Sequence, residues 1–531
     1  MKISNINKSL KGLGLVLCLA FLGMTFHSCD PLDLDEDPGK SRLAILPYTN
    51  EAELNLAVNG AYDRLHRALW MTTAWVSAWG GDDLTTHRAS NKADFREYDQ
   101  RAVSDGNSRT RQTWNVLFQT IRATNVVLAN AAATDLPDRV AQDRLIGEAH
   151  FIRGYCYHHL IRVFESLPIV TSSVPDFDIS LSSRDAVFAF IESDYKAAES
   201  MLPMSSTNGT TRPSVGSARG FLARLYMDWA GYPTSDGSKY AQAASTAKQV
   251  IDNAGEHGFA LVPDMATLYS LAGSANTEGV FTMSYCATCN NRSNRKMGKL
   301  GLPGDLGGWQ ESFAEIRFFE DMPDNYRKEI TYHTEVPVNA GGRPVNDPST
   351  AVSMLRWEEF KDQQNPVFAK IVGPWEDGTW NGFQSSRADY LMRYAEVLLI
   401  HAEASGRAGS DNAAAWESLN QVRRRAHGLD ANTPDASVDI VSGDLAELAF
   451  TEKKWELAGE FQRWYDLVRL QRVDQALSNR TPQVSIGTDE NGNPKPITSA
   501  SNPILGSLGT DNYFAPINPD EIAQLPGLGP N

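Results

Sequence analysis

Residues 148–164 read EAHFIRGYCYHHLIRVF, and this stretch decides the fold class of the chain. Its apolar residues recur at helical spacing, so it predicts a helix over 139–164. Ala149 and Gly154 are small enough to let a neighbouring helix approach closely, while Tyr155 and Leu160 would fill the seam. Pro168 prevents the helix from continuing much further.

The same periodicity predicts helices on both sides of this stretch. They are expected at 51–69, 109–132, 184–201, 214–230 and 239–254, and again at 387–407, 411–427, 443–459 and 461–476. The alternation of small and large positions is similar to that of tetratricopeptide-type helix pairs, with looser spacing. We therefore predict a mainly α fold of degenerate tetratricopeptide-like repeats.

A long segment between these two groups of helices has no such pattern. Residues 256–386 are rich in Gly, Asn, Asp and Pro but still contain aromatic residues, which disordered segments lack. Loops of this length inside a folded protein are usually functional. We expect an irregular, ligand-binding region at 256–386, between an N-terminal helical region at 51–255 and a C-terminal one at 387–531.

The N-terminus has the pattern of an export signal. Three lysines precede an apolar run at 13–24, and Cys29 follows at the expected cut. The run is shorter than the roughly 20 residues of a membrane-spanning helix, and a cysteine at the cut resembles the lipobox of bacterial lipoproteins. We predict a signal peptide at 1–28, lipidation of Cys29 and an acidic tether at 29–50. The acidic residues could be a solvated linker, but they are also similar to the acidic export signals that follow the lipidated cysteine of surface-exposed lipoproteins.

The net charge indicates which partners the protein can bind, and the cysteine spacing indicates whether it has a disulfide. The net charge is −16 and falls to about −19 without the signal, which argues against nucleic acid as a partner and fits an uncharged ligand. Cys156 is expected to be buried. Cys286 and Cys289 favour a short-loop disulfide over half of a zinc site, because no second ligand pair follows.

Four segments carry a family resemblance, and the first of them is the predicted lipidated start. Residues 148–169, YLMRYAEVLLIHAEA at 390–404 and KKWELAGEFQRWYDLVR at 453–469 resemble motifs of the SusD/RagB family of Bacteroidetes outer-membrane lipoproteins. Phe461 replaces the family's usual glycine. The resemblance implies a non-enzymatic, surface-exposed protein that captures a nutrient, most often a glycan. It also implies a SusC-like TonB-dependent outer-membrane transporter as partner. No cofactor or metal is expected.

Paired acids within the third motif could instead indicate glycosidase chemistry. Glu452 and Glu456 lie four residues apart on one helix face, with Arg463 and Arg469 one to two turns further on. Glycoside hydrolysis needs two carboxylates across a cleft, one of them with a raised pKa. Nearby arginines would lower the pKa of these acids, so we expect them to pair with arginines and fix the helices.

Aromatic residues in loops are the best candidates for a sugar site, because flat rings stack on the apolar faces of sugars. The tryptophans outside the predicted helix interiors are Trp70, Trp75, Trp79, Trp309, Trp357, Trp375 and Trp380. From this set and its neighbours we predict the ligand-binding residues Trp79, Asp82, Asp83, His87, Arg88, Trp309, Trp375 and Trp380. Each tryptophan could alternatively be a loop anchor buried against the helices.

The leading hypothesis is an oligosaccharide-binding lipoprotein of the outer membrane. Alternatives are a peptide- or protein-binding helical-repeat scaffold lipoprotein and a surface glycoside hydrolase. Exposed aromatic rings would favour glycan capture over a peptide-binding groove.

Overall fold

The computed structural model describes residues 47–174, 176–289, 292–498 and 503–529. The predicted signal peptide, Cys29 and most of the predicted acidic tether lie outside the described residues. Residues 47–531 form one unit. Among the described residues, no helix is both long enough and apolar enough to cross a membrane.

The predicted helices of the first half are confirmed to within a few residues. They are α2 (Glu51–Leu69), α4 (Ser108–Ala132), α5 (Arg139–Val163), α6 (Arg184–Met201), α7 (Val215–Ala230) and α8 (Lys239–Asp252). Two short helices, α3 (Ala93–Asp99) and α9 (Ala254–His257), were not predicted. Several begin at a polar cap: the side chains of Asn50, Asp138 and Ser183 accept hydrogen bonds from backbone amides in the first turns of α2, α5 and α6.

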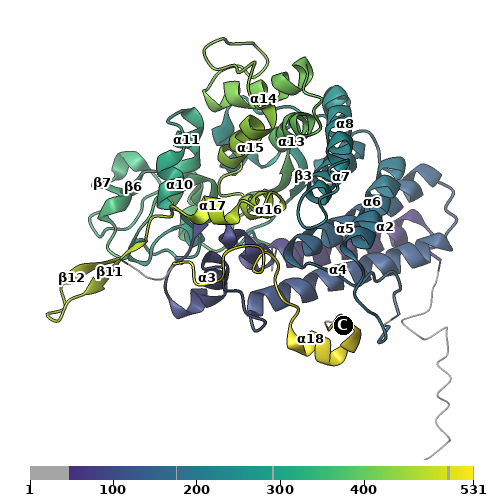
Figure 1. The fold of residues 1–531 in the computed structure, drawn as a ribbon, viewed down its shortest axis with the longest axis horizontal. Coiled ribbons are helices and arrows are strands. Elements are labelled where there is room, and N and C mark those ends of the chain that lie inside the picture. Colours follow the sequence, from purple (N-terminus) through teal and green to yellow (C-terminus); the bar gives the residue numbers. More distant parts are fainter. Residues whose placement is uncertain (1–46, 175, 290–291, 499–502, 530–531) are drawn as a thin grey trace, which may run out of the picture. The chain divides into compact units, whose positions relative to one another are not determined.

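Helix α5 is buried along nearly all of its second half and packs between α4 and α6. A β-carbon at Gly154 would lie 3.0 Å from Cε1 of Tyr195 on α6, so the small residue is what permits this close approach. The packing continues from α6 to α7, from α7 to α8 and from α8 to α13 (Tyr394–Arg407). Figure 1 shows this succession of helices, which is consistent with the predicted helical repeats.

The second group of helices differs from the prediction at two places. It consists of α13, α14 (Ala413–Ala426), α15 (Leu445–Glu456), α16 (Arg463–Arg469), α17 (Val473–Leu477) and α18 (Pro519–Gln524). The predicted helix 387–407 begins as strand β10 (Asp389–Arg393), which pairs antiparallel with β3 (Gly279–Met283). The predicted helix 461–476 is divided into α16 and α17, because Gln471 between them has a left-handed φ of 53°.

The region 256–386 is irregular, as predicted, but contains short strands and helices. Its elements are β3, β4 (Phe313–Ala314), β5 (Tyr332–His333), β6 (Glu335–Val338), β7 (Ser353–Arg356), β8 (Gln363–Gln364), β9 (Val367–Phe368), α10 (Ile316–Asp321), α11 (Tyr326–Thr331) and α12 (Ala369–Val372). Pairing is antiparallel: β6 with β7, β5 with β9, and β4 with β1 (Leu84–Thr85). A turn at 489–493 joins β11 (Val484–Thr488) to β12 (Pro494–Thr498), and β11 also pairs with β8. A further strand, β2, spans Thr207–Thr210.

A buried ionic network joins the second group of helices to the irregular region. Glu456 accepts hydrogen bonds from Arg393 and Arg425 at 3.0 and 2.6 Å, and Glu278 pairs with the same two arginines. All four side chains are almost completely excluded from solvent. Burial opposes ionisation of Glu456, but the surrounding arginines outweigh it and hold its pKa far below the usual range. The predicted structural role of the acids in this motif is confirmed.

The tail of the chain returns to the first helices. The backbone amides of Leu505 and Ala515 donate to the carbonyls of Gln100 and Val163, both at 2.9 Å, and that of Leu181 donates to Gly527 at 3.2 Å. Figure 1 shows α18, in yellow, beside α4. The tail therefore completes the packing of the N-terminal half.

Candidate functional site

Trp79 lies in the core and offers no surface to a ligand. It belongs to the 3-10 helix η1 (Thr72–Gly80), is 0% exposed and contacts Phe95 and Phe461 with ring centroids 4.4 and 5.6 Å apart. Its indole N–H donates to the carbonyl of Glu311 at 3.0 Å. The ring of Phe461 covers Trp79. The backbone of Phe461 has a left-handed φ of 59°, a conformation that glycine favours. The expectation that Trp79 stacks on a sugar is wrong.

Asp82 and Asp83 are also buried and bind other parts of the protein. Arg463 donates to both carboxylate oxygens of Asp82, at 2.7 and 3.2 Å. Burial opposes ionisation of Asp82, but the charge of Arg463 lowers its pKa below the usual value. Asp83 accepts a hydrogen bond from the amide of Gly459 at 3.0 Å, and burial raises its pKa to about 7. Both acids thus fix the end of η1 against the loop between α15 and α16.

His87 and Arg88 have different environments. Nδ1 of His87 accepts a hydrogen bond from the amide of Ala89 at 3.0 Å, so Nε2 carries the proton and donates to Asp362 at 3.1 Å. Asp362 also accepts hydrogen bonds from the amide of Gly304 and from Gln310. His87 is buried and fixes the loop that leads to Trp309, whereas Arg88 is exposed.

Trp309 is the predicted tryptophan that reaches the surface, with 45% of its side chain exposed. Its ring meets Phe383 edge to face, with centroids 5.2 Å apart and planes at 88°. The Nζ of Lys92 lies 5.1 Å from the Trp309 ring, and that of Lys299 lies 5.2 Å from Phe383. We call Trp309, Gln310, Phe383 and Lys299 the Trp309 platform.

The backbone holds this platform in place. The amide of Trp309 donates to the carbonyl of Lys299 at 2.8 Å, and the amide of Lys299 donates to Gly382 at 3.3 Å. Gly308 lies so close to Leu302 that a β-carbon there would be 1.8 Å from the carbonyl oxygen. Lys92, beneath the ring, is buried and paired with Glu311 at 3.0 Å. A ring held this rigidly loses little entropy when it binds a ligand.

Trp375 and Trp380 are loop anchors in a second hydrophobic cluster within the irregular region. They are 6% and 8% exposed. Trp375 lies against His333 with ring centroids 4.5 Å apart, and the indole N–H of Trp380 donates to Asn346 at 2.9 Å. The structure does not bring them to the surface beside Trp309. Phe383 and Lys299 were not predicted from the sequence. The only feature that could have indicated them is their place in loops that contain glycine.

Other predictions concern cysteine and metal chemistry. Cys286 and Cys289 form the predicted disulfide, and Cys156 is buried. Across 47–174, 176–289, 292–498 and 503–529, no group of three or more His, Cys, Asp or Glu side chains could hold a metal ion.

Two known protein families match this chain, one in its C-terminal part and one in its N-terminal part. A family described as the SusD family matches residues 356–531, and one described as "Starch-binding associating with outer membrane" matches residues 32–227. The chain belongs to the SusD family. Among curated SusD-like proteins it resembles protein P2 of Formosa agariphila, with 25% identity over 84% of this chain and 88% of the relative.

Solved structures of the SusD superfamily share the fold. A SusD homologue from Bacteroides thetaiotaomicron is 21% identical, with a TM-score of 0.74 over 92% of this chain and 98% of the other. A laminarin-binding SusD-like protein is also 21% identical, with a TM-score of 0.68 over 90% and 98% of the two chains. A further neighbour, 17% identical with a TM-score of 0.68 over 90% and 98%, was solved with a xylogluco-oligosaccharide.

Proposed function

We propose that this SusD-family protein binds an oligosaccharide through the Trp309 platform at the outer membrane. We further propose that it is anchored by lipid on Cys29 and passes the ligand to a SusC-like TonB-dependent transporter. The observation that carries the binding proposal is the exposed, rigid indole of Trp309 beside Phe383. The laminarin-binding and xylogluco-oligosaccharide-bound neighbours support a glycan as the ligand class.

The platform has the chemistry that sugar binding requires. The Trp309 face offers apolar area to the C–H face of a sugar ring, while Lys299 and Gln310 offer donors to hydroxyl groups. Stacking on one or two rings gives modest affinity, which suits a protein that must release its ligand to a transporter.

Titration calorimetry of the mature protein against a panel of neutral polysaccharides tests the binding proposal. We expect Trp309→Ala to weaken binding of the positive glycan roughly tenfold, because the variant loses most of the stacking area. Phe177→Ala is the matched control, since this aromatic ring is 72% exposed but lies outside the platform. Unchanged affinity in Trp309→Ala would refute the assigned site.

A second candidate, capture of a peptide, is favoured by an apolar groove elsewhere. Trp114, Phe118, Val174, Phe177 and Leu525 line a hollow of about 360 Å³ between α4 and the segments around 174 and 525. A ligand whose binding falls in Phe177→Ala but not in Trp309→Ala would support this candidate.

We also propose that the protein is not an enzyme. A reducing-end assay on every bound glycan tests this proposal, and turnover would contradict it.

The transporter proposal needs the native membrane. Affinity purification of the tagged protein from detergent-solubilised outer membranes should recover a TonB-dependent β-barrel in comparable amount. Recovery of the protein alone, with its lipid anchor intact, would contradict a stable complex.

A further inference from the structure

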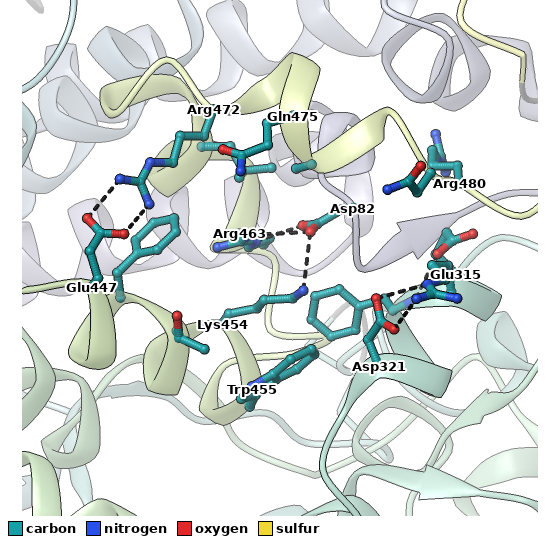
Figure 2. Close-up of a pocket in the computed structure, with 17 residues that line it drawn as sticks. Asp82, Glu315, Asp321, Glu447, Lys454, Trp455, Arg463, Arg472, Gln475 and Arg480 are labelled. Atoms are coloured by element: carbon teal, nitrogen blue, oxygen red, sulfur yellow. Dashed lines mark hydrogen bonds and ion pairs between the residues drawn. The ribbon is translucent and has the colours of Figure 1, made fainter. Parts of the chain in front are cut away.

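A cavity of about 400 Å³ lies apart from the Trp309 platform, between α10, α15, α16 and α17. Figure 2 shows that its inner wall carries Asp82, Lys454, Trp455 and Arg463, while Arg472 and Arg480 lie toward its two sides. None of the residues of the Trp309 platform lines it. Its volume is in the range of small-molecule sites.

Lys454 is held by two aromatic rings and by one long ion pair. Its Nζ lies 4.0 Å from the centroid of the Trp455 ring and 4.7 Å from that of Phe318. Its ion pair with Asp82, drawn in Figure 2, spans 3.8 Å, which is too long for a hydrogen bond. Burial lowers the pKa of Lys454, and the charge of Asp82 offsets this effect only in part.

Arg463 also has unused hydrogen-bonding capacity on this wall. The side chain is only 7% exposed, and its Nε and Nη2 donate to Asp82. Its Nη1 is buried and has no hydrogen-bond partner among the described residues. A buried guanidinium nitrogen without an acceptor is costly, so this position favours an incoming oxyanion.

The carboxylates around the cavity already have partners. Arg472 donates to Glu447 at 2.7 Å, and Arg317 donates to Asp321 at 3.0 Å. Glu315 accepts hydrogen bonds from two backbone amides. Among the described residues that line the cavity, Arg463 Nη1 therefore lacks an acceptor, while each carboxylate already has a partner.

We propose that this cavity binds a small sugar acid, with its carboxylate against Lys454 Nζ and Arg463 Nη1. Gln475 and Asn479 are exposed at the mouth of the cavity, where their amides can bond to the hydroxyl groups of the ligand. A bare inorganic anion would leave most of the volume unused. This proposal does not depend on the Trp309 platform.

Calorimetric titration of the mature protein near neutral pH, with glucuronate, glucose and sodium sulfate as separate probes, tests this proposal. We expect saturable binding of glucuronate, and binding of glucose and of sulfate weaker by roughly tenfold or more. Absence of saturable glucuronate binding would overturn the proposal. Sulfate binding as tight as glucuronate binding would overturn the assignment of a sugar acid and indicate a simple anion site.

Variants locate the site within the protein. Lys454→Met keeps the apolar stem over Trp455 but removes the charge, and should weaken glucuronate binding roughly tenfold. Lys454→Arg should retain most of the affinity. Lys328→Met is the matched control, because Lys328 also lies 4.7 Å from a phenylalanine ring, that of Phe319, but outside the cavity.

A third variant covers the case in which Lys454→Met does not fold. The double substitution of Gln475→Ala and Asn479→Ala changes only exposed residues at the mouth and should weaken glucuronate binding several-fold. Trp309→Ala should leave glucuronate binding unchanged. Equal affinities of the wild type and the folded mouth variant, or loss of glucuronate binding in Trp309→Ala, would overturn the assignment to this cavity.

Discussion

Gly80 lies directly against the indole ring of Trp464: a β-carbon built on Gly80 would be 2.5 Å from Cε3 of that ring. Gly80 ends η1 and Trp464 is in the first turn of α16, so this contact joins two segments that are distant in the sequence. The absence of a side chain at position 80 sets how closely they pack.

Gly80→Ala should therefore destabilise the protein. The added methyl group must displace a buried ring, which costs about 1–3 kcal/mol in the free energy of unfolding. Gly60→Ala is the control, because Gly60 lies within helix α2 with no atom within 4 Å of the added carbon. That change should stabilise the protein by about 0.5–1 kcal/mol. Urea denaturation measures both, and equal shifts would contradict the argument.

Glu278→Gln should be among the most destabilising single changes. Glu278 is fully buried and pairs with both Arg393 and Arg425, so the substitution leaves two buried guanidinium groups with one carboxylate fewer. The expected loss is about 3–5 kcal/mol in the free energy of unfolding. Lys248→Gln breaks an exposed pair with Asp252 on α8 and should cost less than about 1 kcal/mol. Similar losses in the two variants would show that the network contributes little.

The buried carboxyl group of Asp83 should make the stability of the folded protein fall as the pH rises. Its pKa is about 7 in the folded protein but near the ordinary value of roughly 4 when unfolded. Between these values the folded state binds the extra proton, so the contribution of Asp83 to stability is fully present below about pH 4 and is lost as the pH rises to 7.

Asp83→Asn resembles the protonated carboxyl and should remove this dependence. Relative to the wild type, its free energy of unfolding should increase between about pH 5 and pH 8, by on the order of 2 kcal/mol. The free energy of unfolding of the variant must be compared with that of the wild type at each pH, because the buried histidines change the stability of both proteins with pH in the opposite direction. Burial lowers the pKa of His158 to about 4 and that of His159 to about 3, so their contributions are lost as the pH falls below about 6.5. A pH-independent difference would contradict the assigned pKa.

Cys29→Ala should release the protein from the membrane. Without the cysteine, no acyl chain can be attached, and incorporation of labelled palmitate should fall to background. Cys156→Ala is the control, since this buried thiol should not be acylated and the variant should keep the label. Labelling that persists in Cys29→Ala would refute the predicted anchor.

The helical frame was predictable because its helices are long, amphipathic and capped by local sequence signals. Strand β10 was not, because the apolar residues Leu391 and Met392 also fit the helical pattern of α13, and only pairing with β3 makes this segment extended. The break between α16 and α17 depends on one residue with a left-handed φ, and glutamine gives no warning of it.

The candidate site was predictable only in part. A tryptophan in a loop can be exposed or covered, and the difference depends on residues that are distant in the sequence. Trp79 is covered by Phe95 and Phe461, whereas Trp309 meets Phe383 along one edge and remains open. The replacement of the family's glycine by Phe461 was visible in the sequence, but its consequence for Trp79 was not.

The return of the tail to the first helices affects the order in which the protein can mature. The carbonyls of Gln100, near the end of α3, and of Val163, on α5, receive their tail donors only after residues 505–515 have been synthesised and have arrived. The N-terminal half therefore cannot complete its hydrogen bonding until the last part of the chain has been synthesised and has reached it.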